Sequence, residues 1–147
     1  MLWKSRNISS ISLCLCVCKF SCIAGETMWK TLSCTGTGPS PRYRHTCTLV
    51  RNGNPRTNED VLIIFGGIGE NMRCLNDLHI FDLGSMKWID LGITSGDIPA
   101  PLFGHISFPV ESGFSSACPN CCDALMIFGG RCVLRFPRIN VFALKFP

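Results

Sequence analysis

Apolar residues in this chain gather in short runs that end at glycine, proline, asparagine or aspartate, and no segment keeps a helical period over several turns. Runs of this length and punctuation predict an all-β protein. The runs at 60–65 and 124–128 are apolar on consecutive residues, which predicts that both faces of these strands are covered. The strands are expected in two sets, the first over 44–50, 60–65, 77–83 and 87–91, and the second over 104–110, 124–128 and 139–145.

The two sets are copies of one unit. The run Val61-Leu-Ile-Ile-Phe-Gly-Gly67 returns as Ala124-Leu-Met-Ile-Phe-Gly-Gly130. Because the order and the spacing of the residues around it are also kept, the chain contains a tandem repeat. A four-stranded sheet of this kind cannot bury both faces alone, so each unit needs a neighbour stacked on it. Trp29, Pro41, His45 and Gly66 return 59, 60, 60 and 63 residues later as Trp88, Pro101, His105 and Gly129.

Each unit carries a glycine pair and a tryptophan with expected structural roles. Gly66-Gly67 and Gly129-Gly130 are placed where the second strand of each unit stops, because glycine permits positive φ and the close approach of another backbone or ring. Trp29 and Trp88 follow a third strand after a short turn and would anchor their sheets against a neighbour.

These features together resemble the kelch repeat of β-propellers. The likeness is carried by the glycine pair after an apolar strand, by Asn76-Asp77 opening the next strand, by Trp88, and by Pro39-Ser-Pro41-Arg42 leading to His45. The resemblance implies four-stranded antiparallel blades with a period of roughly 50 residues. It also implies a non-catalytic module or scaffold that presents loops to a partner protein.

The resemblance covers Met28 to the C-terminus and implies an incomplete kelch-type β-propeller. We expect a first repeat over 28–91 and a truncated second repeat over 92–147, in which Leu102 replaces the arginine and Asn140 alone remains of the Asn-Asp pair. Residues 1–27 form an atypical segment, with a run that has the position of a strand from an incomplete preceding blade. Propellers typically have about four to eight blades. The chain is therefore interpreted as a fragment or, alternatively, as a protein that completes its propeller by self-association.

The N-terminal segment and the cysteines bear on localisation. Lys4 and Arg6 before an apolar run also fit a signal peptide, but Lys19 interrupts the run, and no stretch reaches the about 18 apolar residues of a membrane-spanning helix. Eleven cysteines cannot all pair, which favours a reduced cytoplasmic or nuclear setting. Cys118 and Cys121 have the spacing of half a zinc site, but no second pair follows, so no metal is expected.

The sequence contains no catalytic constellation. Tyr43 is the only tyrosine, which excludes copper-radical chemistry of the galactose-oxidase type, and a nucleophile elbow and a phosphate loop are both absent from the sequence. His45 and His105 share one repeat position, which indicates a structural duty, and His79 is expected to be a partly buried packing residue. We predict no enzymatic activity and no cofactor. The alternative is an accessory part of a larger enzyme or ubiquitin-ligase adaptor whose active module lies outside this chain.

Basic residues gather at one end of the predicted sheets, where the loops after the second and fourth strands meet. Six arginines there stand against Glu70 and Asp97, and the resulting net charge of +4 equals that of the whole chain. Because arginine binds carboxylates at two points and is enriched at interfaces, we predict that this end binds an acidic segment of a partner protein. The candidate partner-binding residues are Arg42, Arg44, Arg73, Arg131, Arg135 and Arg138.

There are two alternatives to that prediction. In the first, Arg42 and Arg44 hold neighbouring strands together and contact no partner. In the second the partner is a nucleic acid, which we do not expect because proline and apolar residues interrupt the basic residues and the isoelectric point is only about 8.5. No membrane partner is expected.

Overall fold

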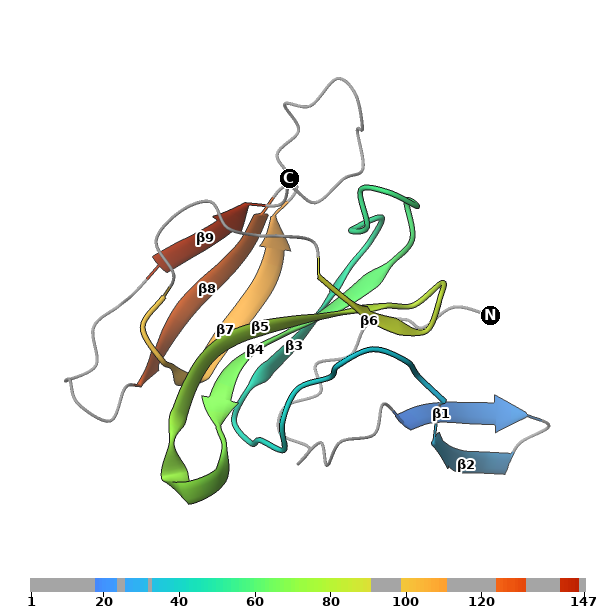
Figure 1. Cartoon of the computed structure of the whole chain (residues 1–147), viewed down its shortest axis with the longest axis horizontal. Coiled ribbons are helices and arrows are strands. Elements are labelled where there is room, and N and C mark those ends of the chain that lie inside the picture. Colours follow the sequence, from blue (N-terminus) through green and yellow to red (C-terminus); the bar gives the residue numbers. More distant parts are fainter. Residues whose placement is uncertain are drawn as a thin grey trace.

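A computed structural model describes residues 18–23, 26–31, 33–90, 99–110, 124–131 and 141–145 of the 147-residue chain, and for 18–31 and 141–145 it describes the backbone only. These residues form three antiparallel sheets, so the all-β prediction is confirmed (Figure 1). A 3-10 turn, η1 (Glu70–Met72), is the helical element of the described part. The strands are β1 (Cys18–Ile23) and β2 (Glu26–Thr31); β3 (Thr46–Val50), β4 (Val61–Ile68), β5 (Cys74–Asp82) and β6 (Lys87–Ile89); and β7 (Phe103–Val110), β8 (Ala124–Arg131) and β9 (Val141–Lys145).

The larger two sheets are meanders, in which each strand pairs with the strand next to it in sequence. The first sheet has the order β3-β4-β5-β6, and the second sheet repeats its first three strands as β7-β8-β9. The registers correspond as well, since Thr46 lies opposite Phe65 in the first sheet and Ile106 lies opposite Phe128 in the second. The sequence repeat is therefore a repeat of backbone structure.

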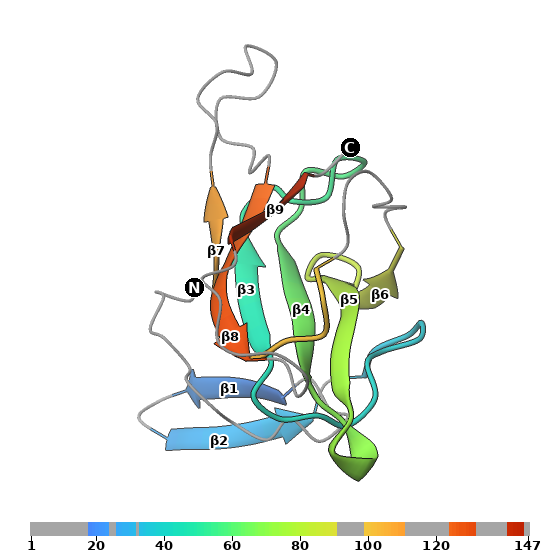
Figure 2. The same cartoon turned by 90° about the vertical axis from the view of Figure 1, so that its left-hand side faces the viewer.

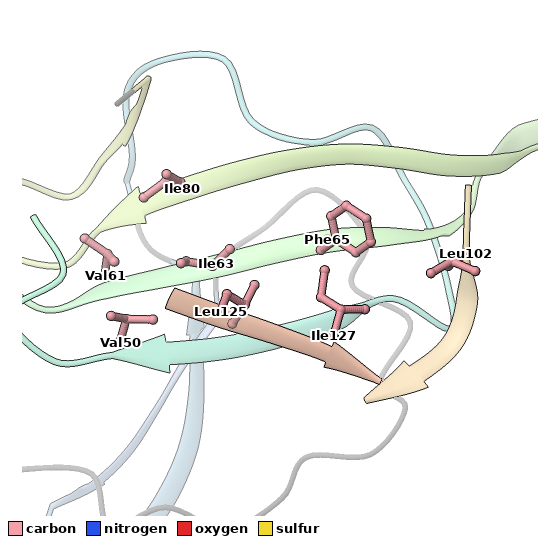
Figure 3. Packing of buried hydrophobic residues seen from close by; sticks show 8 residues of the cluster. All are labelled: Val50, Val61, Ile63, Phe65, Ile80, Leu102, Leu125 and Ile127. Carbon is pink, nitrogen blue, oxygen red and sulfur yellow. The ribbon is translucent and has the colours of Figure 1, made fainter. Parts of the chain in front are cut away.

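The core lies between these two sheets. The second sheet packs against one face of the first (Figure 1), and Figure 2 is turned so that the second sheet faces the viewer. The apolar side chains of the cluster interdigitate as in other sheet-on-sheet packings (Figure 3). The first sheet supplies Val50, Val61, Ile63, Phe65 and Ile80, the second supplies Leu125 and Ile127, and the connecting segment supplies Leu102.

The other face of the first sheet, here called the outer face, carries the tryptophan of the unit. Trp88 on β6 lies opposite Phe81 on β5, with ring centroids 5.0 Å apart. The backbones of β1 and β2 bring Phe20 and Trp29 into the same opposed register. The hairpin of β1 and β2 lies to the side of the two larger sheets (Figures 1 and 2).

The stretch before β3 returns to the far edge of the first sheet. Thr35 forms a parallel bridge with Lys87, the amide of Thr35 donates to Met86, and the amide of Trp88 donates to Thr35. A Cβ atom on Gly38 would lie 2.7 Å from the indole nitrogen of Trp88, so glycine lets this stretch lie directly over the ring. The outer strand β6 thus has an isolated bridge at Lys87 on the side away from β5.

The expected position of the glycine pairs was wrong. β4 continues through Gly66 and Gly67, and β8 continues through Gly129 and Gly130. Gly66 and Gly67 have φ values of +60° and +98°, and the pairing of β4 with β5 shifts register between Phe65 and Gly67. The left-handed residues thus form a bulge within the strand, because the backbone beyond them keeps its hydrogen bonds to both neighbours.

Candidate functional site

Arg42 is buried and fully engaged inside the protein. Its side chain is 2% exposed, and its guanidinium forms a two-point ion pair with Asp77, with Nη1 to Oδ1 at 2.6 Å and Nη2 to Oδ2 at 2.8 Å. It also donates to the carbonyl of Gly66 at 3.2 Å and to both oxygens of Ser40. The prediction that Arg42 contacts a partner is therefore corrected, because its donors join the start of β3 to β4 and β5.

Asp77 links this pair to the outer face. Its Oδ2 lies 2.8 Å from Nε2 of His79, whose ring stands edge-on to Trp88 at 6.3 Å. Burial acts to raise the pKa of Asp77, but the hydrogen bonds from His79 and Arg42 and the charge of Arg42 outweigh it and hold that pKa well below its usual range. His79 is partly buried, as predicted, and serves as the second partner of this carboxylate.

Three other predicted arginines remain exposed at the same end of the two sheets. Arg44 precedes β3, Arg73 precedes β5, and Arg131 ends β8. The guanidinium of Arg44 lies 5.8 Å from the ring centroid of Phe103, within the range of a cation–π contact. Within the described part of the chain, none of the three forms an ion pair with a carboxylate. We call Arg44, Arg73 and Arg131 the arginine face; Arg135 and Arg138 lie outside the described residues.

Two exposed apolar side chains lie beside the arginine face and were not predicted. The hydroxyl of Tyr43 donates to the sulfur of Met72 at 3.0 Å, and both residues are exposed. Met72 belongs to η1, in which Asn71 and Met72 have φ values of 55° and 59°. Left-handed backbone at two successive residues other than glycine is unfavourable by about 1–2 kcal/mol each. The sequence feature that could have predicted this exposed contact is Met72 itself, an apolar residue in the loop between two strands.

His105 lies at the junction of the two sheets, where glycines make room for it. A Cβ atom on Gly66 would lie 3.2 Å from Cε1 of His105, and one on Gly130 would lie 2.9 Å from its Cβ. Its Nε2 shares a hydrogen bond of 2.9 Å with Oγ1 of Thr46, and its ring stands edge-on to Phe65 at 5.3 Å. The predicted structural duty is therefore confirmed, with a side-chain hydroxyl as the partner.

The electrostatics of this junction keep the imidazoles neutral. Burial, assisted by the nearby His45, lowers the pKa of His105 to about 4. Burial and the charge of Arg42 likewise lower the pKa of His45, whose Cβ would lie 2.8 Å from a Cβ on Gly67. Each histidine thus packs against the second glycine of its own sheet.

Backbone hydrogen bonds fix the segment that leads into β7. The amide of Gly67 donates to Leu102 at 2.8 Å, the amide of Leu102 donates to Leu75 at 3.1 Å, and the amide of Gly104 donates to Arg44 at 2.9 Å. Leu102 occupies the repeat position of Arg42. Val141 pairs with Phe128 as Leu78 pairs with Phe65, so in the sequence Asn140 precedes Val141 as Asp77 precedes Leu78. Both charges of the ion pair are thus lost together in the second repeat.

The described residues contain no group of three histidine, cysteine, aspartate or glutamate side chains that could hold a metal ion, and the cysteines at 118–122 lie outside them. Across the described ranges, no helix is long and apolar enough to cross a membrane. Cys34, Cys47 and Cys74 are free thiols.

Several known proteins are similar to this chain in sequence. The KLHDC2/KLHL20/DRC7 Kelch-repeats domain matches residues 16–132. The human (Homo sapiens) Rab9 effector protein with kelch motifs is 34% identical over 107 residues, which cover 71% of this chain and 25% of that protein. Acyl-CoA-binding domain-containing protein 4 of Arabidopsis thaliana is 37% identical over 81 residues, or 54% of this chain and 11% of that protein. The chain thus spans about a tenth to a quarter of these relatives.

Proposed function

This chain belongs to the kelch-repeat family, and from that premise we propose that it is a non-catalytic protein-interaction module whose arginine face binds an acidic segment of a partner protein. The observation that carries the proposal is the set of three exposed guanidinium groups without carboxylate partners among the described residues, at one end of two stacked sheets. Each guanidinium group can donate two hydrogen bonds to one carboxylate.

The surroundings of these arginines support an interface. Tyr43 and Met72 lie beside them, and aromatic residues, methionine and arginine are the types enriched at interfaces. We therefore propose an acidic segment that also carries an apolar side chain, which would cover the contact between Tyr43 and Met72.

Rigidity of the supporting backbone also supports the proposal. The internal pair of Arg42 and Asp77 and the bonds from Gly67 and Gly104 hold the loops at this end together. A surface whose loops are already fixed loses little conformational entropy on binding. Stable presentation of loops, rather than chemistry, is what this end of the protein is built to provide.

The names of the relatives favour a second candidate for the whole protein. Matches include a Rho GTPase-activating protein and a probable serine/threonine-protein kinase, both of Dictyostelium discoideum, and the matched part is 5% and 6% of their lengths. The blades of this chain would then be an accessory module of a larger enzyme or adaptor. The name Rab9 effector protein with kelch motifs, by contrast, contains no enzymatic activity.

The proposal extends to organisation and setting. We propose repeats over 28–91 and 92–147, with β1 and β2 as strands of a preceding blade, since Phe20 and Trp29 reproduce the register of Phe81 and Trp88. Three free thiols among the described cysteines support a cytoplasmic setting. Self-association is a further part of the proposal.

Charge reversal at the arginine face tests the proposed function. The full chain with Arg44→Glu, Arg73→Glu and Arg131→Glu would be titrated against a fluorescent peptide of alternating aspartate and glutamate with one central leucine. We expect fluorescence anisotropy to show at least a tenfold loss of affinity. Added salt should weaken binding of the natural chain, because exposed charges are screened.

The matched control changes the same charge elsewhere. Arg51→Glu, Arg56→Glu and Lys87→Glu place three reversals at exposed positions at the opposite end of the first sheet, and affinity should stay within about twofold. Equal affinity in both variants and the natural chain would overturn the proposed function. Circular dichroism verifies that each variant keeps its strands.

A further inference from the structure

The second sheet has one covered and one bare face. His105, Ser107, Leu125 and Ile127 point toward the first sheet, and the residues between them point away. On the side that points away, Ile106 is 58% exposed, Phe108 45% and Phe128 42%. No described element lies over this side, which forms the outer surface of the pair of sheets (Figures 1 and 2). We call Ile106, Phe108 and Phe128 the open face.

The corresponding positions of the first sheet are all covered. The two registers make Thr46, Thr48 and Phe65 the equivalents of Ile106, Phe108 and Phe128. Thr46 bonds to His105, the hydroxyls of Thr48 and Ser107 meet, and Phe65 is 1% exposed under the ring of His105. The open face thus consists of stacking positions that no element of the described part covers.

The first glycine of each pair gives independent support. A Cβ atom on Gly66 would lie 2.7 Å from the carbonyl of Leu102, which leads into the next sheet, whereas one on Gly129 would have nothing within 4 Å. Gly129 nevertheless has the same left-handed backbone, with φ at +71° beside +60° for Gly66. The space that the carbonyl of Leu102 fills beside Gly66 is therefore open beside Gly129.

The outer face of the first sheet has the complementary chemistry. His45, Cys47 and Leu62 stand there at the positions of His105, Ser107 and Leu125, and Cys47 is exposed. In a repeat of the internal junction, Phe108 would meet Cys47 where Thr48 meets Ser107. Both members of the polar pair are replaced by apolar groups together, so neither side leaves a buried hydroxyl without a partner.

We propose that a second copy of this chain stacks on the open face head to tail, with the Cys47 side of its first sheet against Ile106, Phe108 and Phe128. The proposal rests on the self-association included in the proposed function. The contact joins two different faces, so each copy can bind a next one until a ring closes.

A disulfide tests this geometry directly. The side chains of Thr48 and Ser107 are in hydrogen-bond contact inside one chain, so a thiol introduced by Phe108→Cys should lie within bonding reach of Cys47 in the next copy. Mild oxidation of the purified full-length variant should give dimers and higher ladders on a non-reducing gel. The variant Phe108→Cys with Cys47→Ser should return to the background of the natural chain.

The control within one chain is Thr48→Cys with Ser107→Cys. It should gain an internal disulfide, shown by mass and by peptide mapping, without a change in the number of copies. Ladders that persist after Cys47→Ser would indicate contact between two open faces and overturn the head-to-tail arrangement. A cross-linked species that contains a foreign protein would also overturn this arrangement. So would a result in which the Phe108→Cys variant stays monomeric although the control variant forms its internal disulfide.

Peptide binding separates this inference from the function of the arginine face. Phe108→Glu should convert associated chains to monomers in analytical ultracentrifugation and leave affinity for the acidic peptide within about twofold. Monomers in the natural chain with normal peptide binding would overturn stacking alone. Association without peptide binding would overturn the arginine face alone.

Discussion

Gly66 packs closely against the imidazole of His105, and a Cβ atom added at Gly66 would lie 3.2 Å from that ring and 2.7 Å from the carbonyl oxygen of Leu102, which precedes it in the junction. The strand on one side of the junction carries a left-handed backbone so that the strand on the other side can approach. The repeated glycine pair is thus a property of the junction between sheets, and its two members serve different neighbours.

Alanine substitutions at the first glycine of each pair should separate the cost of left-handed backbone from the cost of a clash between the two sheets. Gly129→Ala is expected to lower the free energy of unfolding by about 1 kcal/mol, the cost of left-handed backbone for a residue with a Cβ atom. Gly66→Ala carries that cost and also a clash with the carbonyl of Leu102, so we expect a loss about two to three times as large. Urea unfolding at low protein concentration measures both, and equal losses would contradict the junction contact.

The pair of Arg42 and Asp77 should show strong coupling. Asp77→Asn leaves a buried guanidinium without its counter-charge and is expected to cost about 3 kcal/mol of stability. Arg42→Leu should cost less, because Asp77 is 42% exposed and water can solvate it. The double variant reproduces the Leu102 and Asn140 of the second repeat. It should be more stable than the sum of the single losses predicts, and strict additivity in the double-mutant cycle would refute the coupling.

Acid should weaken the fold in two separate windows. His105 has a folded pKa of about 4 against about 6.5 when unfolded, so the unfolded chain binds its proton first. Stability should fall by up to about 3 kcal/mol as pH drops from 6.5 to 4. The pKa of Asp77 is depressed, so its contribution is lost only at more acidic pH.

Unfolding of His105→Gln across the same pH range isolates the contribution of the histidine. The variant should be less stable at pH 7 and show a shallower decline between pH 6.5 and 4, the remaining slope belonging to His45. A decline as steep as that of the natural chain would show that His105 is protonated in the folded protein.

Met72 should contribute to binding without contributing to the core. Met72→Ala removes the exposed thioether that Tyr43 contacts, and we expect a three- to tenfold loss of affinity for the leucine-bearing acidic peptide. Affinity for the same peptide with alanine in place of leucine should barely change. An unchanged melting temperature shows that the fold is intact, and equal losses for both peptides would argue against an apolar anchor.

The sequence repeat was enough to predict the strands of the two larger sheets, because apolar periodicity and spacing report local structure directly; the hairpin partner β2 was not predicted. The repeat did not predict that β4 continues past Gly67, since positive φ permits a bulge as well as an end. The burial of Arg42 depends on Asp77, 35 residues away in sequence. The signal for that pair was present, because the second repeat lacks both charges.

The exposed part of the candidate site was harder to predict. Arg44 and Arg73 stand in loops like Arg42, and composition does not tell a free guanidinium from a paired one. The positions of the carboxylates in space decide which arginine is paired, and of these three arginines only Arg42 lies next to Asp77. Tyr43 and Met72 come together through η1, where Met72 itself adopts the left-handed backbone that Asn71 favours and methionine does not.

The parallel bridge between Thr35 and Lys87 has a consequence for how this protein can misassemble. An outer strand with free amide and carbonyl groups recruits foreign strands and seeds fibres. Here the chain's own leading stretch occupies that position on β6 by bonding to Met86 and Trp88. Growth by strand addition is blocked there, so deleting the residues around Thr35 should turn an orderly protein into an amyloid-prone one.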